Sequence, residues 1–214
     1  MKINAAKTKI MLFNKSQILD FQPEITLQNS ETYLDVVDQS RLLGLQVTTD
    51  LRWAAHTQSI VKRANSKLWM LRRMKLLNID PYIIVDFYFK EIRSICEMAC
   101  QVFHSGLTQN QSKDIENIQK RALKIILGGA YHSYEVACTL VSAEPLYDRR
   151  LSQCLKFVRK AVKSRLHSDI FKHTKNSITT RSSNKRLLEY TCNSQRYFNS
   201  PLVFLSRLYN QNIK

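Results

Sequence analysis

The residues best suited to binding chemistry are seven cations in one short stretch of the chain. The stretch runs from Leu51 to Ile79 and contains no acidic residue. The cations are Arg52, Lys62, Arg63, Lys67, Arg72, Arg73 and Lys75. Lysine and arginine side chains neutralise phosphates and release the counterions that surround a nucleic acid. The stretch therefore predicts binding of a polyanion.

The charge of the whole chain agrees with this prediction. Its 214 residues include 33 Lys and Arg but only 17 Asp and Glu, which gives a formal net charge of +16. Such a charge repels itself unless an acidic partner screens it, and nucleic acid is the commonest partner of this kind. Trp69 can stack on a base or sugar, although a large aromatic residue is more often part of a core. The alternative is a basic face that only meets solvent.

Residues that could catalyse a reaction or hold a metal are few. Asp35 and Asp38 are three apart on an expected strand and therefore point to opposite faces. Cys96, Cys100 and His104 share one face of an expected helix, but two turns is too long a span for one tetrahedral ion. Phosphate-binding and hydrolase motifs are absent from the sequence. We therefore expect no catalytic residue, no metal and no cofactor.

The first fifty residues predict short strands, because brief apolar runs alternate with polar turn-like segments. The runs are "KTKIMLF", "EITLQ", "TYLDVV" and "LLGLQV". A hairpin is expected around Asn29 and Ser30. Together they predict a small antiparallel sheet from about Thr8 to Val47 with an uncovered apolar face or edge.

A block of helices is expected next. The first runs from Asp50, as its N-cap, to about Asn78, and the second starts at Asp80 and Pro81 and ends near Phe103. The third begins after Thr108 and stops at Gly128, with Ile115, Ile118, Ala122 and Ile125 buried and with an exposed Glu116–Lys120 pair. Two further helices, near "SYEVACTLVSA" and from about Pro145 to Arg165, complete the block. The fold class is therefore expected to be α+β.

The last part of the chain differs in composition. From about Lys172 it is rich in Ser, Thr and Asn, with many basic residues, which predicts a basic and partly disordered tail. Its final "PLVFLSRLY" is apolar enough to dock as a short helix. We thus expect three parts: residues 1–50 as strands, residues 51–171 as helices and residues 172–214 as the tail.

Cysteine usage and hydropathy indicate a cellular setting. The five cysteines are an odd number without disulfide-framework spacing, and no apolar run is long enough for a signal sequence or a membrane span. The sequence therefore predicts an intracellular protein with no membrane partner, and does not distinguish nucleus from cytoplasm.

The order of several segments resembles a known family. "NAAKTKIMLF", "RLLGLQVTTDLRWAAH", "IENIQKRALKII" and "EPLYDRRL" together resemble the C-terminal palm and thumb of jockey-type non-LTR retrotransposon reverse transcriptases. The resemblance covers roughly Ile3 to Phe171. It implies a primer-grip hairpin at Leu43, Gly44 and Leu45, and a thumb that opens at Trp53 and His56.

The family's catalytic centre has no counterpart in this sequence. The metal-binding Y-x-D-D turn would lie just before the residues that match "NAAKTK", and the sequence contains no such turn. Two Mg²⁺ ions need those carboxylates, so the resemblance implies an RNA-directed DNA polymerase fragment that is inactive alone. Its implied partners are RNA or DNA, with weak sequence preference, and the missing polymerase half supplied in trans.

Two alternatives to a nucleic-acid-binding remnant stay open. One is a structural fragment that has no independent function without the missing half. The other rests on a similarity of "KTKIMLF" to the short N-terminal region of AlkB-type tRNA-modifying enzymes, without their oxidoreductase or methyltransferase residues.

Overall fold

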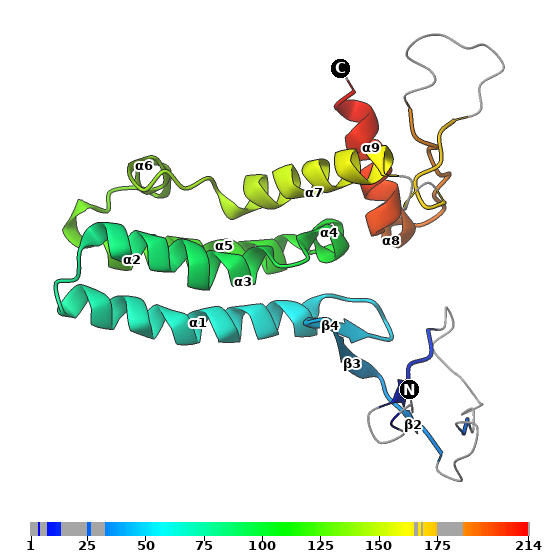
Figure 1. Cartoon of the computed structure of the whole chain (residues 1–214), viewed down its shortest axis with the longest axis horizontal. Coiled ribbons are helices and arrows are strands. Elements are labelled where there is room, and N and C mark those ends of the chain that lie inside the picture. Colours follow the sequence, from blue (N-terminus) through cyan, green and yellow to red (C-terminus); the bar gives the residue numbers. More distant parts are fainter. Residues whose placement is uncertain are drawn as a thin grey trace. The chain divides into compact units, whose positions relative to one another are not determined.

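The computed structural model describes residues 4, 8–13, 25–26, 33–164, 167, 169–174 and 186–213. The chain divides into two compact units, residues 1–59 and residues 60–214. Short strands occur in the first unit and helices make up most of the second (Figure 1). The fold class is therefore α+β, as predicted.

An antiparallel hairpin is the most regular part of the first unit. Strand β3 (Gln39–Leu42) pairs with β4 (Leu45–Thr48). Leu43 and Gly44 connect the strands with φ angles of 48° and 89°, as a tight hairpin turn requires. The interpretation of "LLGLQV" as one strand is wrong, because its second and third residues, Leu43 and Gly44, form this turn.

A second pair of strands is parallel. Strand β1 (Lys9–Ile10) pairs with β2 (Asp35–Val36), and their backbones run in the same direction. A parallel pair needs a long connection, which residues 11–34 supply. The prediction of a single antiparallel sheet is therefore wrong for these strands.

The hairpin predicted between "EITLQ" and "TYLDVV" is represented by a single β-bridge. Thr26 bridges Tyr33 in antiparallel orientation, and the turn expected at Asn29 and Ser30 lies outside the described residues. Large apolar side chains of this unit are exposed, as predicted. They are Phe13, Ile25, Tyr33, Val36, Leu42, Leu43 and Leu51.

Helix α1 (Ala54–Leu76) starts later than predicted. Asp50 is not its N-cap: the Asp50 carboxylate accepts from the Arg52 amide at 3.0 Å and the Thr48 hydroxyl at 2.6 Å, which fixes the turn after β4. The first helical bond runs from the Thr57 amide to the Trp53 carbonyl at 2.8 Å. One side of α1 is apolar and buried. Its buried members in the second unit are Ile60, Ala64, Leu68 and Leu71.

The segment after α1 is one helical rod with a break. Helix α2 (Pro81–Phe87) is capped by Asp80, whose carboxylate accepts from the Tyr82 amide at 2.7 Å, as predicted. The rod continues through a π-helical segment, η2 (Tyr88–Arg93), and α3 (Ser94–Glu97), and it resumes as α4 (Cys100–Phe103) and the 3₁₀ turn η3 (His104–Gly106).

The break lies at Met98 and Ala99, so the prediction of a continuous helix to Phe103 is wrong. Ala99 has a φ of 54° in the left-handed region. Both sides of the break bond the same residue of a later helix. The Glu97 carboxylate accepts from Nε2 of the Gln153 side chain, and the Cys100 thiol donates to Oε1 of the same side chain at 3.2 Å. These hydrogen bonds to α7 lie on either side of Ala99, whose left-handed backbone conformation is unfavourable for alanine by itself.

Helix α5 (Gln109–Leu127) forms the core of the second unit. Thr108 and Gln111 form the predicted capping box at its start, and Gly128 ends it with a φ of 56°. Ile115, Ile118 and Ala122 are buried as predicted, but the buried residue near the end is Ile126, with Ile125 only half-buried. Its buried polar residue, Gln119, accepts from the Tyr88 hydroxyl at 2.5 Å and donates to the Glu144 carbonyl at 3.0 Å.

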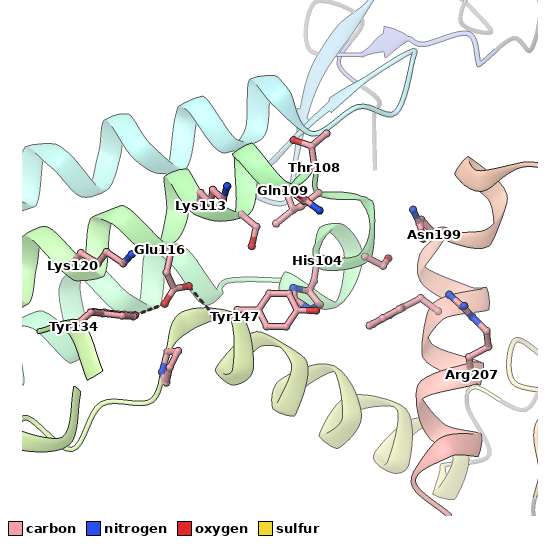
Figure 2. A pocket seen from close by; sticks show the side chains of 15 residues that line it. His104, Thr108, Gln109, Lys113, Glu116, Lys120, Tyr134, Tyr147, Asn199 and Arg207 are labelled. Carbon is pink, nitrogen blue, oxygen red and sulfur yellow. Dashed lines mark hydrogen bonds between the residues drawn. The ribbon is translucent and has the colours of Figure 1, made fainter. Parts of the chain in front are cut away.

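The Glu116 carboxylate caps another helix. It accepts from the amides of Leu146 and Tyr147, at 2.9 and 3.0 Å, where helix α7 (Leu146–Lys163) begins, and it also accepts from the Tyr134 hydroxyl (Figure 2). The expected Glu116–Lys120 pair is therefore wrong; the Lys120 ammonium lies 5.0 Å from the centre of the Tyr134 ring. Helix α6 (Tyr134–Leu140) is short, as predicted.

The end of the chain is folded against the helical unit. Helices α8 (Gln195–Phe198) and α9 (Pro201–Gln211) follow one another, and α9 contacts α7 and α4. The Asn210 amide group bonds both the amide and the carbonyl of Leu187. The short helix predicted for the final apolar segment is therefore present as α9, and Val203, Leu205 and Leu208 on its apolar face are buried. Residues 175–185 lie outside the described residues.

Candidate nucleic-acid interface

One face of α1 carries cations and an indole toward solvent. Lys62, Ser66, Trp69 and Arg73 follow one another at spacings of four, three and four, so they share one side of the helix. Trp69 is 58% exposed, and the Arg73 guanidinium carbon lies 5.9 Å from its ring centre. Trp69 is therefore a surface residue, and it is available for stacking.

Three cations define what we call the α1 basic face: Lys62, Arg72 and Arg73. All three are exposed. Among the residues that the structure describes, none of the three forms an ion pair. Lys62 and Arg73 lie opposite the buried stripe of α1, and Arg72 lies at the side of the helix. The α1 basic face can therefore meet phosphates without first breaking an ion pair within the described residues.

The other predicted cations of this helix have partners or partial burial. The Lys67 ammonium is 2.9 Å from the Glu91 carboxylate, and the Lys75 ammonium donates to the Ile126 carbonyl at 2.8 Å, near the C-terminus of α5. A cation at that end interacts favourably with the helix dipole. Arg63 is half-buried. These three residues link α1 to its neighbours or lie at its edge, which a count of charges cannot reveal.

Arg52 precedes α1 and belongs to the first unit. Its guanidinium lies 3.6 Å from the Asp50 carboxylate, and both side chains are largely exposed. The primer-grip-like residues Leu43, Gly44 and Leu45 also lie in the first unit, at the turn of the β3–β4 hairpin. Leu43 is 91% exposed, whereas Leu45 is buried.

The cysteines are placed for packing. Cys96 and Cys100 are fully buried on opposite sides of the break at Ala99, so the single helical face expected for Cys96, Cys100 and His104 does not exist. Burial raises the pKa of Cys96 to about 12. A hydrogen bond with Cys154 lowers the pKa of Cys100. In the described part of the chain, no three His, Cys, Asp or Glu residues are grouped to hold a metal ion.

A pocket in the second unit was missed by sequence reasoning. Its volume is about 620 Å³, and its walls come from three stretches that are distant in sequence. These stretches are residues 104–120, residues 134–147 and residues 199–207. No local spacing or motif could have joined them, because only the packing of α5, α7 and α9 does so.

The chain matches no family model, no curated protein and no solved structure. Within the described ranges, no helix combines the length and the hydropathy that crossing a membrane requires.

Proposed function

We propose that this chain is a reverse-transcriptase-derived protein, inactive alone, that binds RNA or DNA backbone through α1. The observation that carries the proposal is the α1 basic face, in which Lys62, Arg72 and Arg73 are exposed without ion pairs and Trp69 is exposed among them. These 214 residues contain no Y-x-D-D turn to hold the two Mg²⁺ ions, so we expect no polymerase activity from them alone.

The salt dependence of binding tests this proposal. If each of the three cations contacts one phosphate, the slope of log affinity against log salt has a contribution from the face of about −2.7 on duplex DNA, since each contact gives roughly −0.9. Over a fourfold rise in salt this contribution weakens binding by about 40-fold. Binding should depend little on sequence, because phosphate contacts carry no base information.

The variant is a triple change of Lys62, Arg72 and Arg73 to Gln. Its matched control changes Lys156, Lys160 and Lys163 to Gln, which removes the same charge from exposed positions of α7. Fluorescence anisotropy over a salt series should show a slope smaller by up to about 2.7 for the first variant and little change for the control. Equal slopes for the two variants would show that only net charge matters.

Trp69 gives a second readout on the same face. Trp69→Ala should weaken binding of a single-stranded oligonucleotide by about 1–3 kcal/mol, because an unpaired base can stack on an exposed indole. The salt slope should stay the same, since the change removes no charge. If Trp69→Ala reduced the salt slope but left the affinity at low salt unchanged, the result would argue against stacking.

A structural fragment that completes a larger polymerase is the second candidate. The exposed apolar side chains of the first unit favour it, because soluble monomers rarely expose such groups together. Tyr33→Lys and Leu43→Lys should then lower binding of a hydrophobic dye, as judged by fluorescence, without changing unfolding of the second unit. Unchanged dye binding would contradict this candidate.

A further inference from the structure

The pocket of about 620 Å³ lies between the start of α5, the start of α7 and α9. Figure 2 shows Lys113 and Lys120 along α5, Arg207 on α9, and Tyr147 with His104 between them. All of its lining residues belong to the second unit. Its volume is in the range of small-molecule sites.

The charged groups of the lining are mostly positive. The lining contains three cations, Lys113, Lys120 and Arg207, and one carboxylate, that of Glu116. That carboxylate already accepts two backbone amides of α7 and the Tyr134 hydroxyl. The Arg207 guanidinium donates to the Phe198 carbonyl at 3.0 Å, but its buried Nε has no hydrogen-bond partner in the described part of the chain. The Arg207 guanidinium therefore has an N–H donor that no described residue uses.

The buried guanidinium of Arg150 lies behind two residues that line the pocket. Arg150 is fully buried, and it donates from Nε to His104 at 3.4 Å and from Nη2 to Ser112 at 3.2 Å, both of which line the pocket. Its Nη1 has no hydrogen-bond partner, and no carboxylate among the described residues forms an ion pair with it. Burial lowers the pKa of His104 to about 4, so His104 stays neutral near pH 7. Among the described residues no ion pair neutralises Arg150, and the carboxylate whose charge acts on it is that of Glu116, which also lines the pocket.

Flat apolar surfaces lie next to these cations. The His104 ring centre is 5.1 Å from that of Tyr147 and 5.8 Å from that of Phe204, and all three residues line the pocket. Tyr147 is half-exposed, so its ring is open to a ligand. Cations beside aromatic rings suit a ligand that has an anionic group and a planar ring.

We propose that this pocket binds a small phosphorylated compound with a planar ring, of which a nucleoside monophosphate is the simplest example. Lys113 and Arg207 hold the phosphate, and Tyr147 packs against the ring. Arg150 contributes through its charge and is a positioning residue for Ser112 and His104. The site uses none of the residues of the α1 basic face, so it stands independently of the proposed function.

Calorimetric titration of the full chain with adenosine 5′-monophosphate, adenosine and inorganic phosphate tests the proposal. The monophosphate should bind more tightly than either part alone. Lys113→Gln and Arg207→Gln should each weaken it by about tenfold, because each removes a charged donor to phosphate. Tyr147→Ala should weaken adenosine and the monophosphate but not phosphate. Lys156→Gln, which removes a charge outside the pocket, should change nothing.

The triple variant at Lys62, Arg72 and Arg73 separates this proposal from the first one. It should bind the monophosphate like the unchanged chain while it loses salt-dependent oligonucleotide binding. The pocket proposal is overturned if the monophosphate does not bind at millimolar concentration, if it binds no better than phosphate, or if the pocket variants behave like Lys156→Gln.

Discussion

Replacing Glu116 with alanine should strongly destabilise the second unit. The carboxylate accepts the first amides of α7, from Leu146 and Tyr147 at 2.9 and 3.0 Å, and it also accepts the Tyr134 hydroxyl. Hydrogen bonds to a charged group contribute about 1.5–3 kcal/mol each, and a carboxylate at a helix N-terminus adds roughly 0.3–1 kcal/mol. Glu116 is only half-buried, and water can replace part of these bonds. We therefore expect a loss of about 2–4 kcal/mol.

Urea unfolding followed by circular dichroism measures this loss. Glu116→Gln keeps an acceptor without the charge, so it should lose about half as much as the alanine variant. Asp114→Asn is the matched control, because Asp114 is an exposed acid on the same helix that forms no ion pair within the described residues, and it should stay within about 0.5 kcal/mol.

Hydrogen exchange locates the effect. The amides of Leu146 and Tyr147 should lose protection in Glu116→Ala, while amides in the middle of α1 should change only with global stability. If Glu116→Ala unfolds at the same urea concentration as Asp114→Asn, the reasoning that this carboxylate holds the start of α7 is refuted.

Three further outcomes are expected. Gln119→Leu should lose about 2–4 kcal/mol in urea unfolding, because it leaves the buried Tyr88 hydroxyl without its acceptor; a loss below about 1 kcal/mol would contradict this. Burial lowers the pKa of His104 to about 4, so the unfolded chain takes up the proton first and stability should fall by about 2 kcal/mol between pH 7 and pH 5, a slope that His104→Gln should remove. Iodoacetamide should label Cys192 before the four buried cysteines, and mass spectrometry of the native protein checks this order.

The starts of several helices could be predicted because their signals are local. The Asp80 carboxylate accepts from the Tyr82 amide, and Thr108 and Gln111 form a capping box, so both partners of each bond lie within three residues of the cap. Asp50 has the same residue type but lies in a turn after a strand, where Thr48 and Arg52 use its carboxylate. A capping residue is therefore informative only when the residues after it begin the helix at once.

The partners of charged residues could not be predicted from the sequence. Lys67 and Glu91 are 24 residues apart, Lys75 and Ile126 are 51 apart, and Glu116 caps a helix 30 residues later. The segment from Leu51 to Ile79 contains no acid, yet the fold brings one from η2 to Lys67. For this reason only three of the seven predicted cations, Lys62, Arg72 and Arg73, are exposed on α1 without an ion pair or a side-chain hydrogen bond to another described residue.

The two positive sites of the second unit can be told apart by the physics of their ligands. A nucleic-acid strand carries condensed counterions, so its binding to the α1 basic face should weaken steeply with salt. A nucleoside monophosphate carries no such atmosphere, and its binding beside the buried Arg150 should depend far less on salt. If both affinities fell with the same slope, the pocket would be acting through net charge alone. A shallow slope for the monophosphate and a steep one for the strand would instead require two separate sites on one helical unit.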